Sequence, residues 1–158
     1  MLPEKPGPGQ ESVWDYPRPP ALVASDRLVT VEHGGEVLAE TRRAFRVLET
    51  SHPPTWYVAP DDARPGVLAP SKARSTFCEW KGAATYWDVR GLEAAAWSYP
   101  HPTGDFVDLT GYLAFSPSRL QCFVDGQQVR PQEGGFYAGW ITDDVVGPFK
   151  GAPGTWGW

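Results

Sequence analysis

Glycine and proline punctuate this chain so densely that long helices have little room. Each of the two accounts for 17 of the 158 residues. Proline lacks the N–H that a helix interior needs, and glycine favours turns. The segments between them are short alternating apolar runs, and aromatic residues reach 13% of the chain, both of which are typical of β structure. We therefore predict a mostly β fold: a single compact antiparallel domain, barrel-like or tent-like, with only short helical turns.

Several segments have the alternation expected of strands. The strongest signal is at residues 27–41, where two apolar runs flank Gly34-Gly35 and predict a hairpin. Further strands are expected at residues 44–48, 55–58, 76–80, 85–89 and 95–99. One helical turn is expected within residues 61–68. Residues 92–96 have clear helical propensity, but this stretch is too short to decide its structure by itself.

Composition divides the chain into three parts. Residues 1–19 form a proline-rich N-terminal arm, in which we expect residues 1–10 to be mobile and Trp14 to dock on the body. Residues 20–130 form the core β domain. Residues 131–158 form a tail rich in glycine and aromatic residues, which we expect to pack on the core through Trp140, Phe149, Trp156 and Trp158.

Charge and composition narrow the classes of partner. The net charge of −5 argues against nucleic acid, because binding to its backbone needs a broad positive face. No stretch approaches the roughly 18 apolar residues of a membrane span. Cys78 and Cys122 are too few for a disulfide framework and the N-terminus has no apolar signal segment, so we expect a cytoplasmic protein. The three histidines show no metal-binding spacing, so no metal site is predicted.

A basic, hydroxyl-rich stretch stands out against this acidic background. Residues 71–82 contain three basic residues, Lys72, Arg74 and Lys81, and one acidic residue, Glu79, so that the stretch has a net charge of +2. Ammonium, guanidinium and hydroxyl groups close together are suited to binding phosphate or carboxylate. We predict that this stretch forms one wall of a pocket for an anionic small molecule. The alternative is that these cations are ordinary solvated charges.

The stretch itself supplies the polar groups of the predicted pocket. Lys81 would be its principal cation, and Ser71 and Thr76 its hydroxyl donors. Gly82 would be the point at which the backbone approaches the ligand. In an extended chain Thr76 and Lys81 face opposite sides, so a turn at Lys81-Gly82 is needed to bring them together.

The remaining members of the pocket are aromatic or sulfur-containing. Tyr57, Trp97 and Tyr99 would supply the apolar walls that small-molecule pockets usually have. Cys78 would also lie against the ligand. Its thiol is either a nucleophile, activated by Lys81 or a neighbouring histidine, or a buried strand residue.

Four segments together resemble one bacterial family. They are ESVWDYPRPP at residues 11–20, LAPSKARSTFCEWKGAATYW at 68–87, AAWSYPHP at 95–102 and GYLAF at 111–115. The most specific part is the pattern T-x-C-x-x-K-G-x-A-x-Y-W at residues 76–87. On these motifs the chain resembles the domain-of-unknown-function family four-two-seven. The resemblance implies a compact, mostly β domain and says very little about activity.

The family also carries a nucleotidyltransferase label. Enzymes of that kind hold two magnesium ions with converging carboxylates, often at D-x-D spacing. The acidic pairs here are Asp61-Asp62 and Asp143-Asp144, and adjacent side chains point to opposite faces of an extended chain. A nucleotidyltransferase-like enzyme is therefore kept only as a further alternative.

Two hypotheses compete for the function. The first is a small-molecule-binding domain with the anion pocket described above; no motif assigns a reaction or a cofactor, so both are unknown. The second is a non-catalytic interaction or oligomerisation domain, in which the arm or the tail covers a partner or the second subunit of a homodimer. Polar groups gathered beside aromatic strands favour the first, because an interaction domain has no need of them.

Overall fold

The computed structural model describes residues 2–135 and 137–158. Strands account for 40% of the chain and helical residues for 8%, so the fold is mostly β, as predicted, and forms one compact domain. The helices of the described residues are short 3-10 segments: η1 (Val13–Asp15), η2 (Pro60–Asp62) and η3 (Gly104–Leu109). The sheets formed by these residues do not close into a barrel.

Two antiparallel sheets join edge to edge into one curved layer. The first has the order β2 (Ala21–Ser25), β5 (Ala44–Leu48) and β6 (Thr55–Tyr57). The second has the order β12 (Leu113–Phe115), β11 (Leu92–Ser98), β10 (Thr85–Val89) and β7 (Leu68–Pro70). Val58, directly after β6, exchanges main-chain hydrogen bonds of 2.7 and 2.9 Å with Leu113 of β12.

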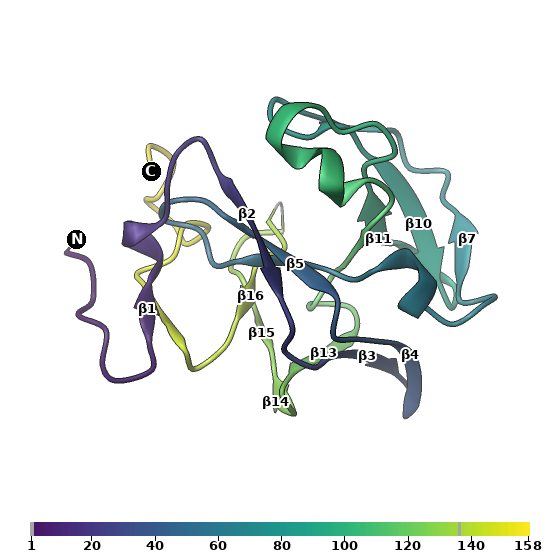
Figure 1. Cartoon of the computed structure of the whole chain (residues 1–158), viewed down its shortest axis with the longest axis horizontal. Coiled ribbons are helices and arrows are strands. Elements are labelled where there is room, and N and C mark those ends of the chain that lie inside the picture. Colours follow the sequence, from purple (N-terminus) through teal and green to yellow (C-terminus); the bar gives the residue numbers. More distant parts are fainter. Residues whose placement is uncertain (1, 136) are drawn as a thin grey trace.

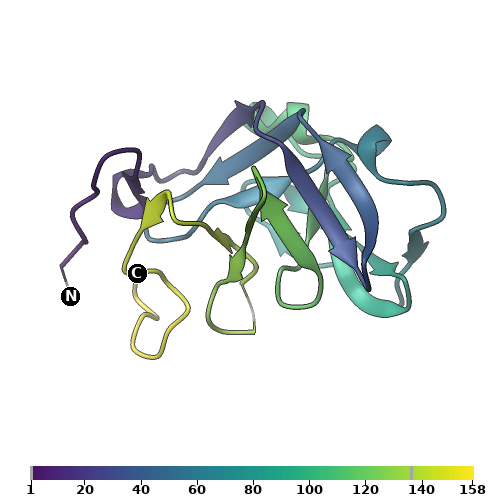
Figure 2. The same cartoon turned by 90° about the horizontal axis from the view of Figure 1, so that it is seen from below.

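A third antiparallel sheet is built from two hairpins. Its order is β14 (Gln127–Gln128), β13 (Gln121–Val124), β3 (Val29–His33) and β4 (Glu36–Thr41). The β3–β4 hairpin turns at Gly34 and Gly35, both with positive φ, as the sequence predicts. Figure 2 shows this sheet facing the viewer, with β3 and β4 in blue and β13 in green.

The two ends of the chain pair with each other. β1 (Glu11–Ser12) in the arm runs parallel to β17 (Val145–Val146) in the tail. β15 (Arg130–Pro131) pairs with β16 (Trp140–Ile141) nearby. Both termini therefore lie at one end of the molecule, and β7 and β10 lie at the opposite end (Figure 1).

The main core fills the space between the curved layer and the third sheet. It contains Val29, Val31, Leu38, Trp56, Val58, Phe115, Val124 and Trp140. Trp56 and Trp140 stack with their ring centroids 6.3 Å apart. The Trp140 indole N–H donates to the Phe115 carbonyl at 3.1 Å, so the buried ring leaves no donor without a partner.

Strand alternation gives the curved layer a second buried face. In β6 and the residue after it, Trp56 and Val58 point into the main core, whereas Tyr57 between them belongs to a second cluster. In β12, Leu113 and Phe115 likewise belong to the main core and Ala114 between them to the second cluster. The second cluster is covered by η3, which lies over β10 and β11 (Figure 1). This face positions the candidate site described below.

The tail packs on the body through fewer rings than the sequence suggests. Trp140 is fully buried, and Phe149 and Trp158 are half-buried. Trp14 of the arm meets Trp158 edge-on at 5.0 Å and donates its indole N–H to the Pro148 carbonyl. Trp156, however, is 89% exposed, so the expectation that it docks is wrong.

Candidate functional site

The basic stretch at residues 71–82 folds into a small projecting unit, which we call the basic arm to distinguish it from the N-terminal arm. β8 (Phe77–Cys78) pairs with β9 (Gly82–Ala83), and the turn between them consists of Glu79, Trp80 and Lys81. The turn therefore begins two residues before the predicted one at Lys81-Gly82 and ends one residue before it. It nevertheless removes the conflict between opposite faces, because Lys81 and Cys78 both reach the second cluster.

Four of the residues assigned to the pocket meet in this cluster. Tyr57 and Tyr99 belong to its buried centre, and Cys78 and Trp97 pack against it from partly exposed positions. Tyr86 lies beside Trp97, with ring centroids 6.4 Å apart. We call these five residues, four aromatic side chains and the Cys78 thiol, the aromatic cluster.

Lys81 lies against this cluster with its charge over two rings. Its Nζ is 5.4 Å from the centroid of the Tyr99 ring and 5.9 Å from that of Phe106 in η3. Both distances are within the range of cation–π attraction. Among the described residues, Lys81 has no carboxylate within ion-pair distance. The ammonium is therefore held in place by rings rather than neutralised by an acid.

Burial raises the pKa of the two central tyrosines. Desolvation raises the pKa of Tyr99 above its ordinary value, and the neighbouring Cys78 and Tyr86 raise it further. Desolvation likewise raises the pKa of Tyr57, and Tyr99 adds to the effect. Tyrosine is protonated at neutral pH even at its ordinary pKa, so both side chains are O–H groups with a hydrogen to donate.

The predicted hydroxyl donors, Ser71 and Thr76, lie elsewhere in the basic arm. Thr76 is exposed, and its Oγ1 lies 2.8 Å from the Tyr86 hydroxyl. Ser71 Oγ accepts a hydrogen bond from the Ala73 N–H at 3.1 Å. Thr76 thus borders the aromatic cluster through Tyr86, whereas the Ser71 hydroxyl serves the loop before the arm.

Gly82 has a structural requirement of its own. Its φ is +88°, and a Cβ at this position would lie 3.3 Å from the carbonyl oxygen of His101. The close backbone approach at Gly82 is therefore made to the segment that leads into η3.

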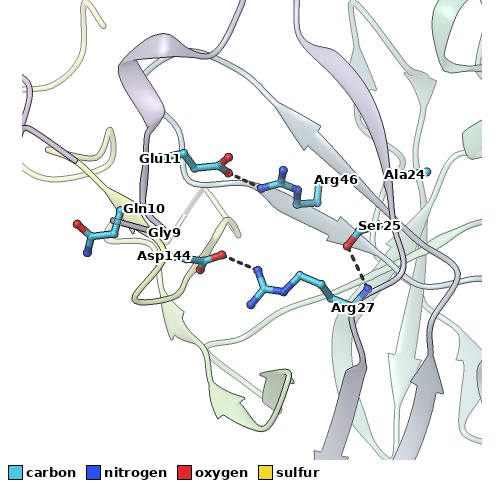
Figure 3. A pocket seen from close by; sticks show the side chains of 8 residues that line it. All are labelled: Gly9, Gln10, Glu11, Ala24, Ser25, Arg27, Arg46 and Asp144. Atoms are coloured by element: carbon cyan, nitrogen blue, oxygen red, sulfur yellow. Dashed lines mark hydrogen bonds and ion pairs between the residues drawn. The ribbon is translucent and has the colours of Figure 1, made fainter. Parts of the chain in front are cut away.

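A second polar region, not anticipated from the sequence, surrounds a cavity near the chain termini. The cavity has a volume of about 280 Å³ and is lined by Gly9, Gln10, Glu11, Ala24, Ser25, Arg27, Arg46 and Asp144. Figure 3 shows two ion pairs side by side at its wall: Arg46 with Glu11, and Arg27 with Asp144. We call it the arginine cavity.

Both guanidinium groups of the arginine cavity rest on one buried ring. The Cζ atoms of Arg27 and Arg46 are 5.9 and 5.7 Å from the centroid of Trp56. The ion-pair distances are 2.5 Å for Arg46–Glu11 and 2.5 Å for Arg27–Asp144, and Arg27 also reaches Asp125 at 2.8 Å. Burial opposes ionisation of Asp144, but hydrogen bonds from Thr142 and Arg27 outweigh it and lower its pKa.

Three of the four carboxylates in the acidic pairs considered for metal binding form ion pairs with arginines. Asp62 accepts from Arg43, Asp143 from Arg130, and Asp144 from Arg27. Within residues 2–135 and 137–158, no three His, Cys, Asp or Glu side chains form a group that could hold a metal ion. In the same part of the chain, no helix has the length and apolar character needed to cross a membrane.

Comparison with known proteins places most of the chain in one family. A search among curated proteins found no match. Residues 21–126 match the family model described as "Domain of unknown function (DUF427)". This match covers β2 to the β13–β14 turn, and so includes the basic arm, the aromatic cluster and both arginines of the arginine cavity. The chain therefore belongs to the DUF427 family.

Proposed function

We propose that the protein binds a small anionic molecule, carrying a phosphate or a carboxylate, beside Lys81 at the aromatic cluster. The observation that supports this most strongly is the state of the Lys81 ammonium, which lies over Tyr99 and Phe106 without a carboxylate partner among the described residues. Rings attract a cation but leave its charge available to an incoming anion.

The surroundings of Lys81 suit an anion that has an apolar part. Tyr99 and Tyr57 contribute hydroxyl groups that are neutral at pH 7, and burial raises the pKa of both further. Trp97 adds a partly exposed ring at the border of the same cluster. The combination of one cation, hydroxyl donors and aromatic walls is the usual composition of a small-molecule site.

Cys78 has a partly exposed free thiol and packs against the cluster that Lys81 contacts. We assign it a contact with the ligand and no step of a reaction, because binding alone accounts for the arrangement of the other groups.

The exposed apolar side chains at this end favour a second candidate function, an interaction or oligomerisation domain. Phe77 on β8 is 79% exposed and Val107 on η3 is 57% exposed. Contiguous exposed apolar patches often mark contact surfaces, and this candidate requires Phe77 and Val107 to belong to one. This candidate differs from the first in a simple way: it requires no anion to bind at Lys81.

The test is a thermal-shift titration of the parent protein with phosphate and acetate, compared with Lys81→Ala and Lys72→Ala. An anion at about 100 times its dissociation constant adds about 2.7 kcal/mol, which raises Tm by roughly 5 to 10 °C in a protein of this size. We expect Lys81→Ala to lose most of this rise. Lys72→Ala, an exposed cation of the same stretch, should keep it.

Two results would contradict the proposal. One is equal stabilisation of the parent and Lys81→Ala by the same anion. The other is the absence of any stabilising anion for the parent, which is what the interaction-domain candidate predicts.

A further inference from the structure

The arginine cavity is assembled from two different parts of the chain. Arg27, Arg46 and Trp56 lie within residues 21–126, the segment that matches the family. Glu11 and Asp144, the carboxylates bound to the two arginines, lie outside it, in the arm and the tail. We infer that Arg27 and Arg46 form a second anion site, suited to a small dicarboxylate, which the chain itself occupies with Glu11 and Asp144.

The arm and the tail present these two carboxylates as one unit. β1 and β17 pair in parallel with Glu11 opposite Val145, and the Glu11 N–H donates to the Asp144 carbonyl at 2.9 Å. The two acidic side chains therefore reach the cavity together. Each accepts a hydrogen bond from a different guanidinium group (Figure 3).

Residues within the segment that matches the family also position the two guanidinium groups. Trp56, beneath both, is 2% exposed and belongs to the main core. Arg27 is also held by Asp125 in the β13–β14 turn. Arg46 donates to Glu11 through Nη1, and Arg27 donates through Nε and Nη1. A guanidinium has five N–H donors, so each arginine has further donors for a ligand.

Charge explains why the site is closed to anions in the parent protein. Three carboxylates, from Glu11, Asp125 and Asp144, face two guanidinium groups, so an additional anion meets an excess of negative charge. If Glu11 and Asp144 are neutral, Asp125 alone opposes the two cations. The cavity of about 280 Å³ then offers both room and positive charge.

The present occupants indicate the class of ligand. Two carboxylates, each bound by its own arginine across one cavity, are the recognition pattern of a dicarboxylate rather than of a single carboxylate. A small dicarboxylate would reproduce both ion pairs in one molecule.

The test uses the full chain with Glu11→Gln and Asp144→Asn together, because these amides keep the shape of the side chains and remove their charge. Succinate is the probe, and acetate at matched ionic strength is the control anion. At about 100 times its dissociation constant, succinate should raise the Tm of the double variant by roughly 5 to 10 °C. All proteins in this test also carry Lys81→Ala, which removes the site proposed above. With Glu11 and Asp144 intact, succinate should produce no such rise, and acetate should have a much smaller effect than succinate on the double variant.

Two additional substitutions locate the binding. Arg46→Gln in the double variant should abolish the effect of succinate. Lys72→Ala, at an exposed cation, should leave it unchanged, and the presence of Lys81→Ala throughout separates this site from the one proposed above. In the Lys81→Ala background, equal stabilisation by succinate with Glu11 and Asp144 intact and in the double variant, or succinate binding that persists after Arg46→Gln, would overturn the inference.

If the double variant lacks the circular dichroism of a folded β protein, Asp144→Asn alone takes its place. It frees Arg27 in part and leaves the Glu11–Arg46 pair intact. A smaller but saturable rise with succinate is then expected, and no rise would overturn the inference.

Discussion

Gly82 limits the sequence of the basic arm through its backbone conformation. Gly82 and Gly91 both have φ near the centre of the left-handed region, at +88° and +82°. Only at Gly82 would a Cβ meet another group, the His101 carbonyl oxygen at 3.3 Å, whereas the space at Gly91 is open. The two glycines therefore form a matched pair for measuring the cost of that contact.

We predict that Gly82→Ala destabilises the protein more than Gly91→Ala does. The left-handed conformation alone costs an L-residue about 1–2 kcal/mol, and both variants have that cost. The crowding against His101 is added at Gly82. Urea unfolding of the two variants measures the difference, and a cost at Gly91 equal to or above that at Gly82 would show that the His101 contact is unimportant.

The aromatic members of the predicted site illustrate what residue patterns can indicate. Trp97 in β11 and Tyr99, directly after its end, are two positions apart in extended chain, so their placement on one side of the sheet follows from the period of two. The role of Phe106 beneath Lys81 was not predicted, because it depends on how η3 folds back over the sheet. Short-range periodicity cannot give such a contact.

At the scale of elements, β11 shows tertiary structure overriding local propensity. Its first residues have helical propensity, yet the whole of Leu92–Ser98 is a strand between β10 and β12. Ala95 and Ala96 are fully buried there. Pairing on both edges and burial of these side chains outweigh the few tenths of a kcal/mol per residue that helix propensity supplies.

The element that carries Asp144 provides a pH-dependent test of tail docking. The hydrogen bonds of Asp144 with Arg27 and Thr142 outweigh the effect of burial and lower its pKa. A carboxyl group with a lowered folded-state pKa stabilises the protein above its unfolded pKa, about 3.9, and this stability is lost as the pH falls through the folded value. Asp144→Asn removes that contribution.

We therefore predict that Asp144→Asn lowers the free energy of unfolding by about 1–2 kcal/mol at pH 7. The difference from the parent should shrink as the pH falls below about 4. Asp143→Asn is the control, since its side chain is 74% exposed and its bond to Arg130 should contribute little. Equal losses in the two variants, or a difference that does not change with pH, would contradict this account of the tail.

At the scale of the whole molecule, the sequence predicts the class of fold better than its assembly. The glycine-centred hairpin and the strands β5 and β10 follow directly from alternating runs between turn residues. The joining of the two sheets at Val58 and Leu113 depends on residues far apart in the chain. Neither segment contains a signal for it.

The arginine cavity, like the joining of the two sheets, is formed by residues far apart in the chain. Arg27 and Asp144 are separated by 117 positions, and Arg46 and Glu11 by 35. Arg27 has no basic neighbour in the sequence and Arg46 follows Arg42 and Arg43, but neither lies in the basic stretch at residues 71–82. Ion pairs between the ends of a chain and its body are set by the folded topology, which composition and spacing do not reveal.

The most direct test of the Lys81 site is a phosphate titration followed by the NMR signals of the indole N–H groups and the Gly82 amide. The chain has 8 tryptophans, of which Trp80 and Trp97 pack against the buried residues of the second cluster, whereas Trp14 and Trp158 lie at the termini. We predict saturable shifts for Trp80, Trp97 and Gly82, which Lys81→Ala abolishes, and no saturable shift for Trp14 or Trp158. Shifts of equal size at both ends of the molecule, or none that saturate near Lys81, would contradict the assignment of the anion site.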